Sequence, residues 1–200
     1  MSVTVNSRMG RVGRWEPDSR GRLQEAALAL YAERGFDQTT AAQIAARAGL
    51  TERTFFRHFA DKREVLFAGS DLLRERIVAA VGAAPTDAAP LLAVGAGLAA
   101  AASALGEMRR DLARQRHAVI SANPELRERE LAKMADYAAA VAAALRTRGV
   151  PEPAATLAAD AGMAVLRVAL ERWASELDDR PLAVVVGDAV AQLRAVAAGA

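Results

Sequence analysis

Apolar residues recur at helical spacing along most of the chain, and capping residues and glycines separate these stretches. Apolar positions between Leu23 and Leu30 share one face of a helix that begins at Ser19 and stops before Gly35. The same pattern predicts further helices at 40–48, 52–59, 61–81, 87–105, 107–121, 124–148, 153–176 and 181–198. Since β-branched runs are almost absent outside 184–186, we expect an all-α fold.

Capping signals in the first third of the chain mark two short helices joined by a tight turn. Thr40 with Gln43 forms a capping box, Gly49 ends that helix, and Thr51 caps the next one. Asp61 with Glu64 repeats the capping-box pattern and predicts one long fourth helix. A glycine turn between two short helices is typical of a helix-turn-helix, although any tight corner between two helices would satisfy the same pattern.

Charge distribution distinguishes the two parts of the chain. Residues 1–63 contain 11 basic and 7 acidic side chains, whereas residues 64–200 contain 15 basic and 17 acidic side chains. This asymmetry favours nucleic-acid binding by the N-terminal part. We expect a flexible basic arm at 1–18 carrying Arg8, Arg11 and Arg14, a DNA-binding domain at 19–66 and a second helical domain at 67–200.

Other function classes receive little support from composition. The chain has no cysteine and two histidines, so we expect no disulfide, no metal site, no cofactor and no enzyme activity centred on His58 or His117. Residues 88–106 carry no charge, but most are Ala, Gly or Ser, which favours a closely packed buried helix over a membrane span. Residues 1–20 lack an apolar core, and we expect a cytoplasmic protein.

A longer pattern, from Arg22 to Leu66, resembles the DNA-binding region of the TetR family of bacterial transcriptional regulators. It includes Gly35-Phe36 with Thr39-Thr40, the segment 44–51, an aromatic pair followed by His58-Phe59, and Asp61-Lys62 before Leu66. The resemblance implies a homodimeric repressor with an N-terminal helix-turn-helix domain and a C-terminal domain for ligand binding and dimerisation. Such a protein would leave its operator when a small apolar effector binds; an activator would have the same sequence features.

The resemblance also assigns roles to residues of the motif. Thr40, Lys62 and His58 would contact phosphate, and the third helix would enter the major groove. Arg53 could read guanine and Glu52 cytosine, although Glu52 could instead neutralise Arg53. Phe56 stands where the family usually has tyrosine, so it lacks the hydroxyl that would bind phosphate. The full set of expected DNA contacts is Thr40, Thr51, Glu52, Arg53, Thr54, Phe56, Arg57, His58 and Lys62.

On each of the last two predicted helices, apolar residues recur every three or four positions and form a stripe, here called a seam. Such seams suit either an antiparallel helix pair that meets its copy in a four-helix bundle or an intramolecular core. The family usually dimerises there, so the expected interface residues are Leu166, Leu170, Trp173, Leu177, Val186, Leu193 and Val196. The middle helices would enclose an effector pocket whose binding shifts the fourth helix. Its candidate lining residues, which could equally be core or surface groups, are Val94, Leu98, Met108, Arg114, His117, Met134, Tyr137 and Met163.

Overall fold

The computed structural model describes residues 19–104, 110–175 and 180–199, and in these ranges the protein is helical without strands. The elements are α1 (Ser19–Arg34), α2 (Ala41–Arg47), α3 (Glu52–His58), the 3-10 helix η1 (Glu64–Phe67), α4 (Ser70–Ala83), α5 (Pro90–Ala104), α6 (Arg110–Ala122), α7 (Pro124–Thr147), α8 (Ala154–Ser175) and α9 (Leu182–Ala197). The predicted all-α class is confirmed. The predicted arm lies outside the described residues.

The capping residues and glycines around the first three helices have the structural roles that the sequence predicts. The Thr40 hydroxyl accepts from the Gln43 N–H, and the Gln43 side chain returns a bond to the Thr40 N–H, which confirms the capping box. Thr51 caps α3 by accepting from the Thr54 N–H. Gly35 and Gly49 adopt φ of 84° and 66°, the left-handed region that ends a helix most easily at glycine.

The prediction of one continuous fourth helix is wrong. The segment divides into η1 and α4 at Gly69, whose φ of 85° interrupts the helix. Asp61 does cap this turn, because its carboxylate accepts from the backbone N–H groups of Arg63 and Glu64. The Glu64 side chain does not complete a capping box but forms an ion pair with Arg129 of α7. The link between the two halves of the molecule is therefore a short turn held by side chains.

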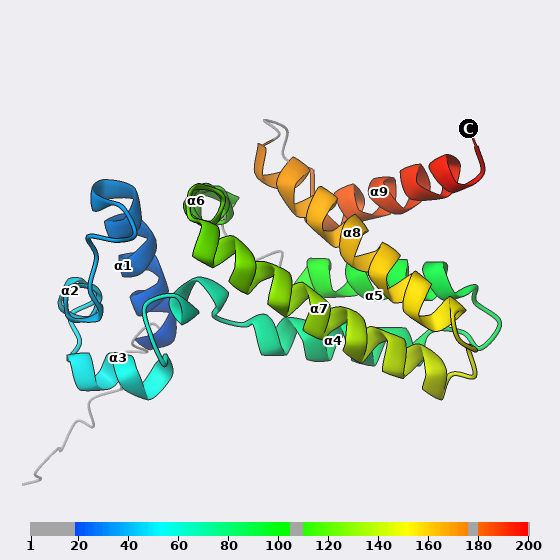
Figure 1. The fold of residues 1–200 in the computed structure, drawn as a ribbon, viewed down its shortest axis with the longest axis horizontal. Helices are drawn as coiled ribbons and strands as arrows, with labels where there is room; N and C mark the ends of the chain where they lie inside the picture. Colours follow the sequence, from blue (N-terminus) through cyan, green and yellow to red (C-terminus); the bar gives the residue numbers. More distant parts are fainter. Residues whose placement is uncertain (1–18, 105–109, 176–179, 200) are drawn as a thin grey trace, which may run out of the picture.

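Two hydrophobic cores organise the molecule. The first joins α1, α2, α3 and η1, and it also includes Val119, Ile120 and Leu126 from α6 and α7. The second joins α4, α5, α7, α8 and α9. Figure 1 shows α1–α3 at one end, α6 between them and the remaining helices, and α4, η1 and α7 leading between the two regions. The corner between α6 and α7 thus belongs to the core of the N-terminal domain, and the predicted boundary at residue 66 falls within η1.

Small residues of α5 allow close helix packing, as the sequence indicates. Val94 and Leu98 are buried, and a methyl group added at Gly97 would lie 2.7 Å from a Val81 methyl of α4. One at Gly162 of α8 would lie 2.3 Å from a methyl of Val94. In the described part of the chain, no helix has both the length and the apolar character to span a bilayer.

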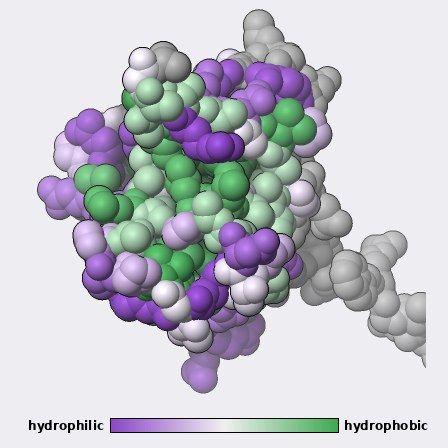
Figure 2. Space-filling view, turned by 90° about the vertical axis from the view of Figure 1, so that its right-hand side faces the viewer, coloured by the Kyte–Doolittle hydropathy of each residue, from purple (hydrophilic) through white to green (hydrophobic). Residues whose placement is uncertain are grey.

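The seams of α8 and α9 turn inward. Leu166, Trp173 and Val186 are buried in the second core, and Leu170 and Leu193 pack partly against it. Val196 is 73% exposed, and Leu177 lies outside the described residues. Large apolar side chains that stay exposed on α5, α8 and α9 are Leu92, Leu157, Val184 and Val196. At the end of the molecule opposite α1–α3, apolar surface forms a patch bordered by hydrophilic residues (Figure 2).

Candidate nucleic-acid interface and adjoining cavity

Helix α3 presents one face to solvent and anchors the other in the first core. Phe55 and Phe59 are buried and their rings lie 5.7 Å apart, so they fix the rotation of this short helix. Phe56, by contrast, is 53% exposed although it is a large apolar residue. The other exposed side chains around this face are Thr51, Glu52, Arg53 and Arg57. An exposed face with two arginines and an aromatic ring suits contact with DNA.

The polar groups at the start of α3 are arranged locally. The hydroxyl oxygens of Thr51 and Thr54 lie 2.9 Å apart, and the Thr51 oxygen also accepts from the Thr54 N–H at 3.1 Å. Within the described ranges, no ion pair joins Glu52 to Arg53, so the neutralising alternative is not adopted here. The Arg53 guanidinium is therefore available to an external partner.

Thr40 lies at the start of α2, where its backbone N–H is already bonded to the Gln43 side chain at 3.0 Å. Its hydroxyl accepts from the Gln43 N–H and keeps its own proton for another acceptor. A phosphate contact by Thr40 remains a prediction, and it would depend on the hydroxyl rather than on the N–H of this residue.

Lys62 points into the protein. Its ammonium donates to the backbone oxygens of Phe36, Asp37 and Thr39 at 2.8, 3.3 and 3.0 Å. It also lies 4.2 Å from the centre of the Phe36 ring. These contacts use all three ammonium protons to hold the turn between α1 and α2. The predicted phosphate contact stays a prediction, and the geometry adds a structural role that the motif did not indicate.

His58 faces the cleft between α3 and α7. Its ring is half-buried, and its Nε2 is fully buried without a hydrogen-bond partner in the described residues. The cleft also contains Asp61, Arg63 and Glu125. Because Nε2 is shielded from solvent in this arrangement, the predicted phosphate contact would have to use the other ring nitrogen or a rotated ring.

Several residues that the motif left unassigned support the three-helix unit. Arg22 donates to the Ala48 carbonyl at the turn before α3, and Arg47 of α2 pairs with Glu33 of α1 at 2.6 Å. The Tyr31 hydroxyl donates to the Lys62 carbonyl at 2.6 Å. Burial, and secondarily the nearby Asp61 carboxylate, raises the pKa of the Tyr31 phenol well above its usual value. The phenol therefore stays protonated and keeps donating this bond.

A cavity of about 180 Å³ lies behind η1, where helices of both domains meet. Of the predicted lining residues, it includes His117, Met134 and Tyr137. Val94, Leu98 and Met163 do not line it and are buried in the second core. The Arg114 guanidinium donates to the Ala174 carbonyl at 2.5 Å and does not line it either. Met108 lies outside the described residues. Leu170, predicted at the dimer interface, lines the cavity.

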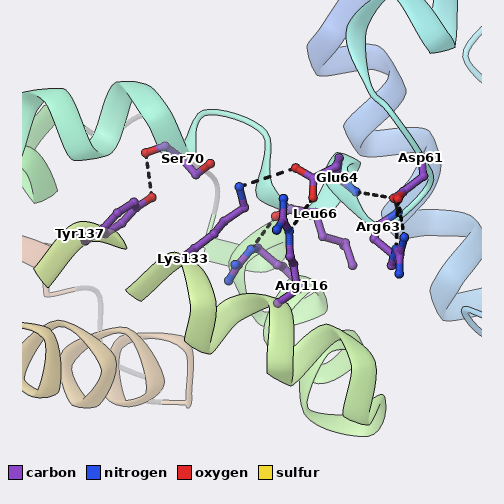
Figure 3. Close-up of polar contacts among 9 residues, drawn as sticks. Asp61, Arg63, Glu64, Leu66, Ser70, Arg116, Lys133 and Tyr137 are labelled. Atoms are coloured by element: carbon purple, nitrogen blue, oxygen red, sulfur yellow. Dashed lines mark hydrogen bonds and ion pairs between the residues drawn. The ribbon is translucent and has the colours of Figure 1, made fainter. Parts of the chain in front are cut away.

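Polar side chains of α6 and α7 connect this cavity to the segment between the domains (Figure 3). Arg116 donates to the Leu66 carbonyl at 2.7 Å and pairs with Glu130 at 3.0 Å. Lys133 lies 3.6 Å from the Glu64 carboxylate. Together they tie η1 to α6 and α7.

Tyr137 continues the same row one turn further along α7. Its hydroxyl donates to the Ser70 carbonyl at 2.7 Å. Burial is the main cause that raises the pKa of this phenol to about 12. Arg129, Lys133 and Tyr137 recur at intervals of four, which places them on one face of a helix. The sequence contains this spacing, but spacing alone does not indicate which segment these side chains contact.

Comparisons with known proteins agree with this geometry. Residues 23–68 match the family model described as bacterial regulatory proteins, tetR family, and residues 105–198 match the model of the MftR C-terminal domain. The chain is 38% identical over 76 residues to the transcriptional regulator TcmR of Streptomyces glaucescens, which is 38% of this chain and 34% of TcmR. It is 41% identical over 66 residues to the repressor KstR2 of Mycobacterium tuberculosis, which is 33% of this chain and 32% of KstR2. The chain thus spans about a third of the length of these curated relatives.

Solved structures show the same fold over most of the chain. The SmeT–triclosan complex has a TM-score of 0.61 at 22% identity and covers 89% of this chain and 90% of SmeT. FadR of Bacillus subtilis in complex with stearoyl-CoA has a TM-score of 0.60 at 17% identity, covering 86% of this chain and 96% of FadR. At these identities the likeness establishes the fold and not the ligand.

Proposed function

Because the chain belongs to the TetR family of bacterial regulatory proteins, we propose that it is a homodimeric transcriptional repressor that a small molecule releases from its operator. The exposed face of α3 carries this proposal, since it offers Arg53, Arg57 and Phe56 on a helix whose opposite face is locked in the core. KstR2, one of the relatives, is a transcriptional repressor. An activator that uses the same face would raise transcription instead.

DNA recognition would divide between bases and backbone. Arg53 would pair with a guanine, Glu52 would accept from a cytosine amine, and Phe56 would press on a thymine methyl. Thr54, Arg57 and the Thr40 hydroxyl would contact phosphates beside the groove. His58 and Lys62 remain candidates for phosphate contact only if their nitrogen atoms leave the inward positions described above.

A second copy of the chain would bring a second α3 to the neighbouring major groove. The buried seams leave the outer faces of α8 and α9 for this contact, and Val184 and Val196 are exposed there. These outer faces would meet in a four-helix bundle. The dimer would thus use different residues of α8 and α9 from those that form the protomer's core.

The cavity of about 180 Å³ is the proposed effector site. A cavity of about 150 Å³ accommodates benzene, so this one suits a ligand with about one ring or a short chain. Triclosan in SmeT and stearoyl-CoA in FadR are the ligands of those proteins. Stearoyl-CoA is far larger than this cavity. The effector of this chain would therefore be a small molecule with an apolar body.

Footprinting of the purified protein on the DNA upstream of its own gene tests the function. We expect a protected near-palindrome, and titration with small molecules should remove the protection. Arg53→Ala should weaken operator binding by about tenfold to a hundredfold and relax preference at one base position, because a bidentate arginine–guanine contact contributes about 1–3 kcal/mol. Arg127→Ala, at an exposed position of α7, is the matched control. Equal losses in both variants would refute the assignment of α3 as the reading helix.

A further inference from the structure

We propose that the cavity behind η1 recognises a small carboxylate with an apolar body, and that the ammonium of Lys133 is the group that binds it. The proposal extends the effector site of the proposed function and rests on it only for the regulatory consequence. It follows from which charges around the cavity already have hydrogen-bond partners and which one does not.

Charged pairs account for the arginines and carboxylates of the cavity wall. Arg116 is bonded to Glu130 at 3.0 Å and to the Leu66 carbonyl at 2.7 Å. Arg167 is bonded to Glu171 at 3.0 Å. Both carboxylates that face the cavity therefore already hold a guanidinium, and neither is left to attract a cationic ligand.

Lys133 differs from these pairs. Its side chain is only 15% exposed, and its single ion-pair contact in the described residues is the Glu64 oxygen at 3.6 Å. That separation exceeds hydrogen-bond range, and no hydrogen bond from this ammonium is found within the described part of the chain. An ammonium on a mostly buried side chain, with a long ion pair to Glu64 and no hydrogen bond in the described residues, favours an anionic acceptor that can reach it. Because Lys133 lines the cavity, such an acceptor can enter from there.

The rest of the cavity is built for an apolar body. The Phe67 ring lies 5.6 Å from the Lys133 ammonium, and Leu73, Met134 and Leu170 contribute to the walls. A carboxylate attached to one ring or a short chain would place its charge on Lys133 and its carbon atoms against these side chains. Neutral analogues would lose the charge-assisted bond but keep the apolar contacts.

The same ammonium helps to attach η1 to α7 through Glu64, as Figure 3 shows. A ligand carboxylate on Lys133 competes with Glu64 for this cation and leaves Arg129 as the remaining partner of Glu64 at 2.7 Å. Since η1 joins α3 to α4, a weaker attachment changes how firmly the DNA-binding domain is held. A carboxylate that binds better to the loosened arrangement would thereby lower DNA affinity.

Isothermal titration calorimetry on the free protein tests the inference. The probes are benzoate, phenylacetate, 3-phenylpropionate and hexanoate, each paired with its neutral primary amide. We expect at least one acid to bind about tenfold to a hundredfold more tightly than its amide, as a charge-assisted hydrogen bond provides. Lys133→Met should abolish this preference, and Lys133→Gln should reduce it. Arg129→Met removes a charge from the same Glu64 but lies outside the cavity, so it should keep the preference.

Three results would overturn the inference. They are absence of binding by every acid, equal binding of acids and amides, and a preference that persists in a folded Lys133→Met protein, with folding checked by circular dichroism. The calorimetry needs no DNA, so the two proposals fail separately. A protein that prefers the acid but binds no DNA would refute the proposed function and retain the carboxylate site.

Discussion

Replacing Lys62 with alanine should destabilise the DNA-binding domain rather than act only at the DNA. The Lys62 ammonium donates to three backbone oxygens of the turn between α1 and α2 and lies 4.2 Å from the Phe36 ring centre. Truncation to a methyl group removes the ammonium donor from all three oxygens, although the Phe36 oxygen still accepts from the Thr39 N–H at 3.2 Å. The turn that precedes α2 would then lose these three attachments to the segment before η1.

The expected size follows from these contacts. Hydrogen bonds to a charged group contribute about 1.5–3 kcal/mol when considered singly. Here three of them share one cation and one carbonyl contact is exposed, so we expect about 2 kcal/mol in total for the bonds. A cation–π contact at a partly exposed site adds about 0.5–1 kcal/mol. The expected loss is therefore about 2.5–3 kcal/mol, a large part of the roughly 5–15 kcal/mol that stabilises a native protein.

Urea unfolding followed by circular dichroism, at one fixed protein concentration, measures this loss. Arg63→Ala is the matched control, because the neighbouring Arg63 forms an exposed pair with Asp61 at 2.7 Å and its loss should cost far less stability than the loss of Lys62. In parallel, operator binding of Lys62→Ala is measured across a series of salt concentrations. A lost phosphate contact reduces the salt slope by about one.

The two measurements separate the structural role of Lys62 from its predicted phosphate contact. An unfolding free energy within about 0.5 kcal/mol of the parent protein would refute the reasoning from the three carbonyl bonds. An unchanged operator affinity and salt slope would instead refute the phosphate contact. We expect reduced stability in either case, since the carbonyl bonds exist without DNA.

Three further predictions test other parts of the fold. Burial raises the pKa of the Tyr137 phenol from 10.0 to about 12, so its contribution to the free energy of unfolding is complete below pH 10 and is lost as the pH rises to about 12. Tyr137→Phe should therefore lessen the loss of stability over this pH range, measured by urea unfolding. Gly162→Ala should cost about 1–3 kcal/mol by overpacking against α5, whereas Gly82→Ala, which meets no atom within 4 Å, should stabilise α4 by up to about 1 kcal/mol in thermal unfolding. Val196→Arg should shift dimer to monomer in light scattering, whereas Leu72→Arg, at another exposed apolar position, should not.

Each of these predictions has an outcome that contradicts it. A pH profile unchanged by Tyr137→Phe would remove the phenol from the alkaline transition. Equal effects of the two glycine substitutions would show that packing at α5 does not decide the difference. A dimer that dissociates equally in both arginine variants would place the contact elsewhere than the outer face of α9.

The sequence by itself determined the all-α class, the caps of α2 and α3 and the anchored face of α3, but not the break between η1 and α4 at Gly69. These features depend on groups only a few residues apart. The Thr40 and Thr51 caps act on N–H groups three positions ahead, and Gly35 and Gly49 end helices through their own backbone angles. A motif of this length therefore also identified the helix-turn-helix and its family.

Tertiary structure alone decided where long side chains find their partners. Lys62 bonds to carbonyls 23 to 26 positions earlier, and Glu64 pairs with Arg129, 65 positions later. It also decided that the apolar face of α8 packs into the core of the same chain, because periodicity defines an apolar face but not the surface that covers it. A flexible charged side chain can reach several groups at similar free energy, and the packing of distant helices selects one of them.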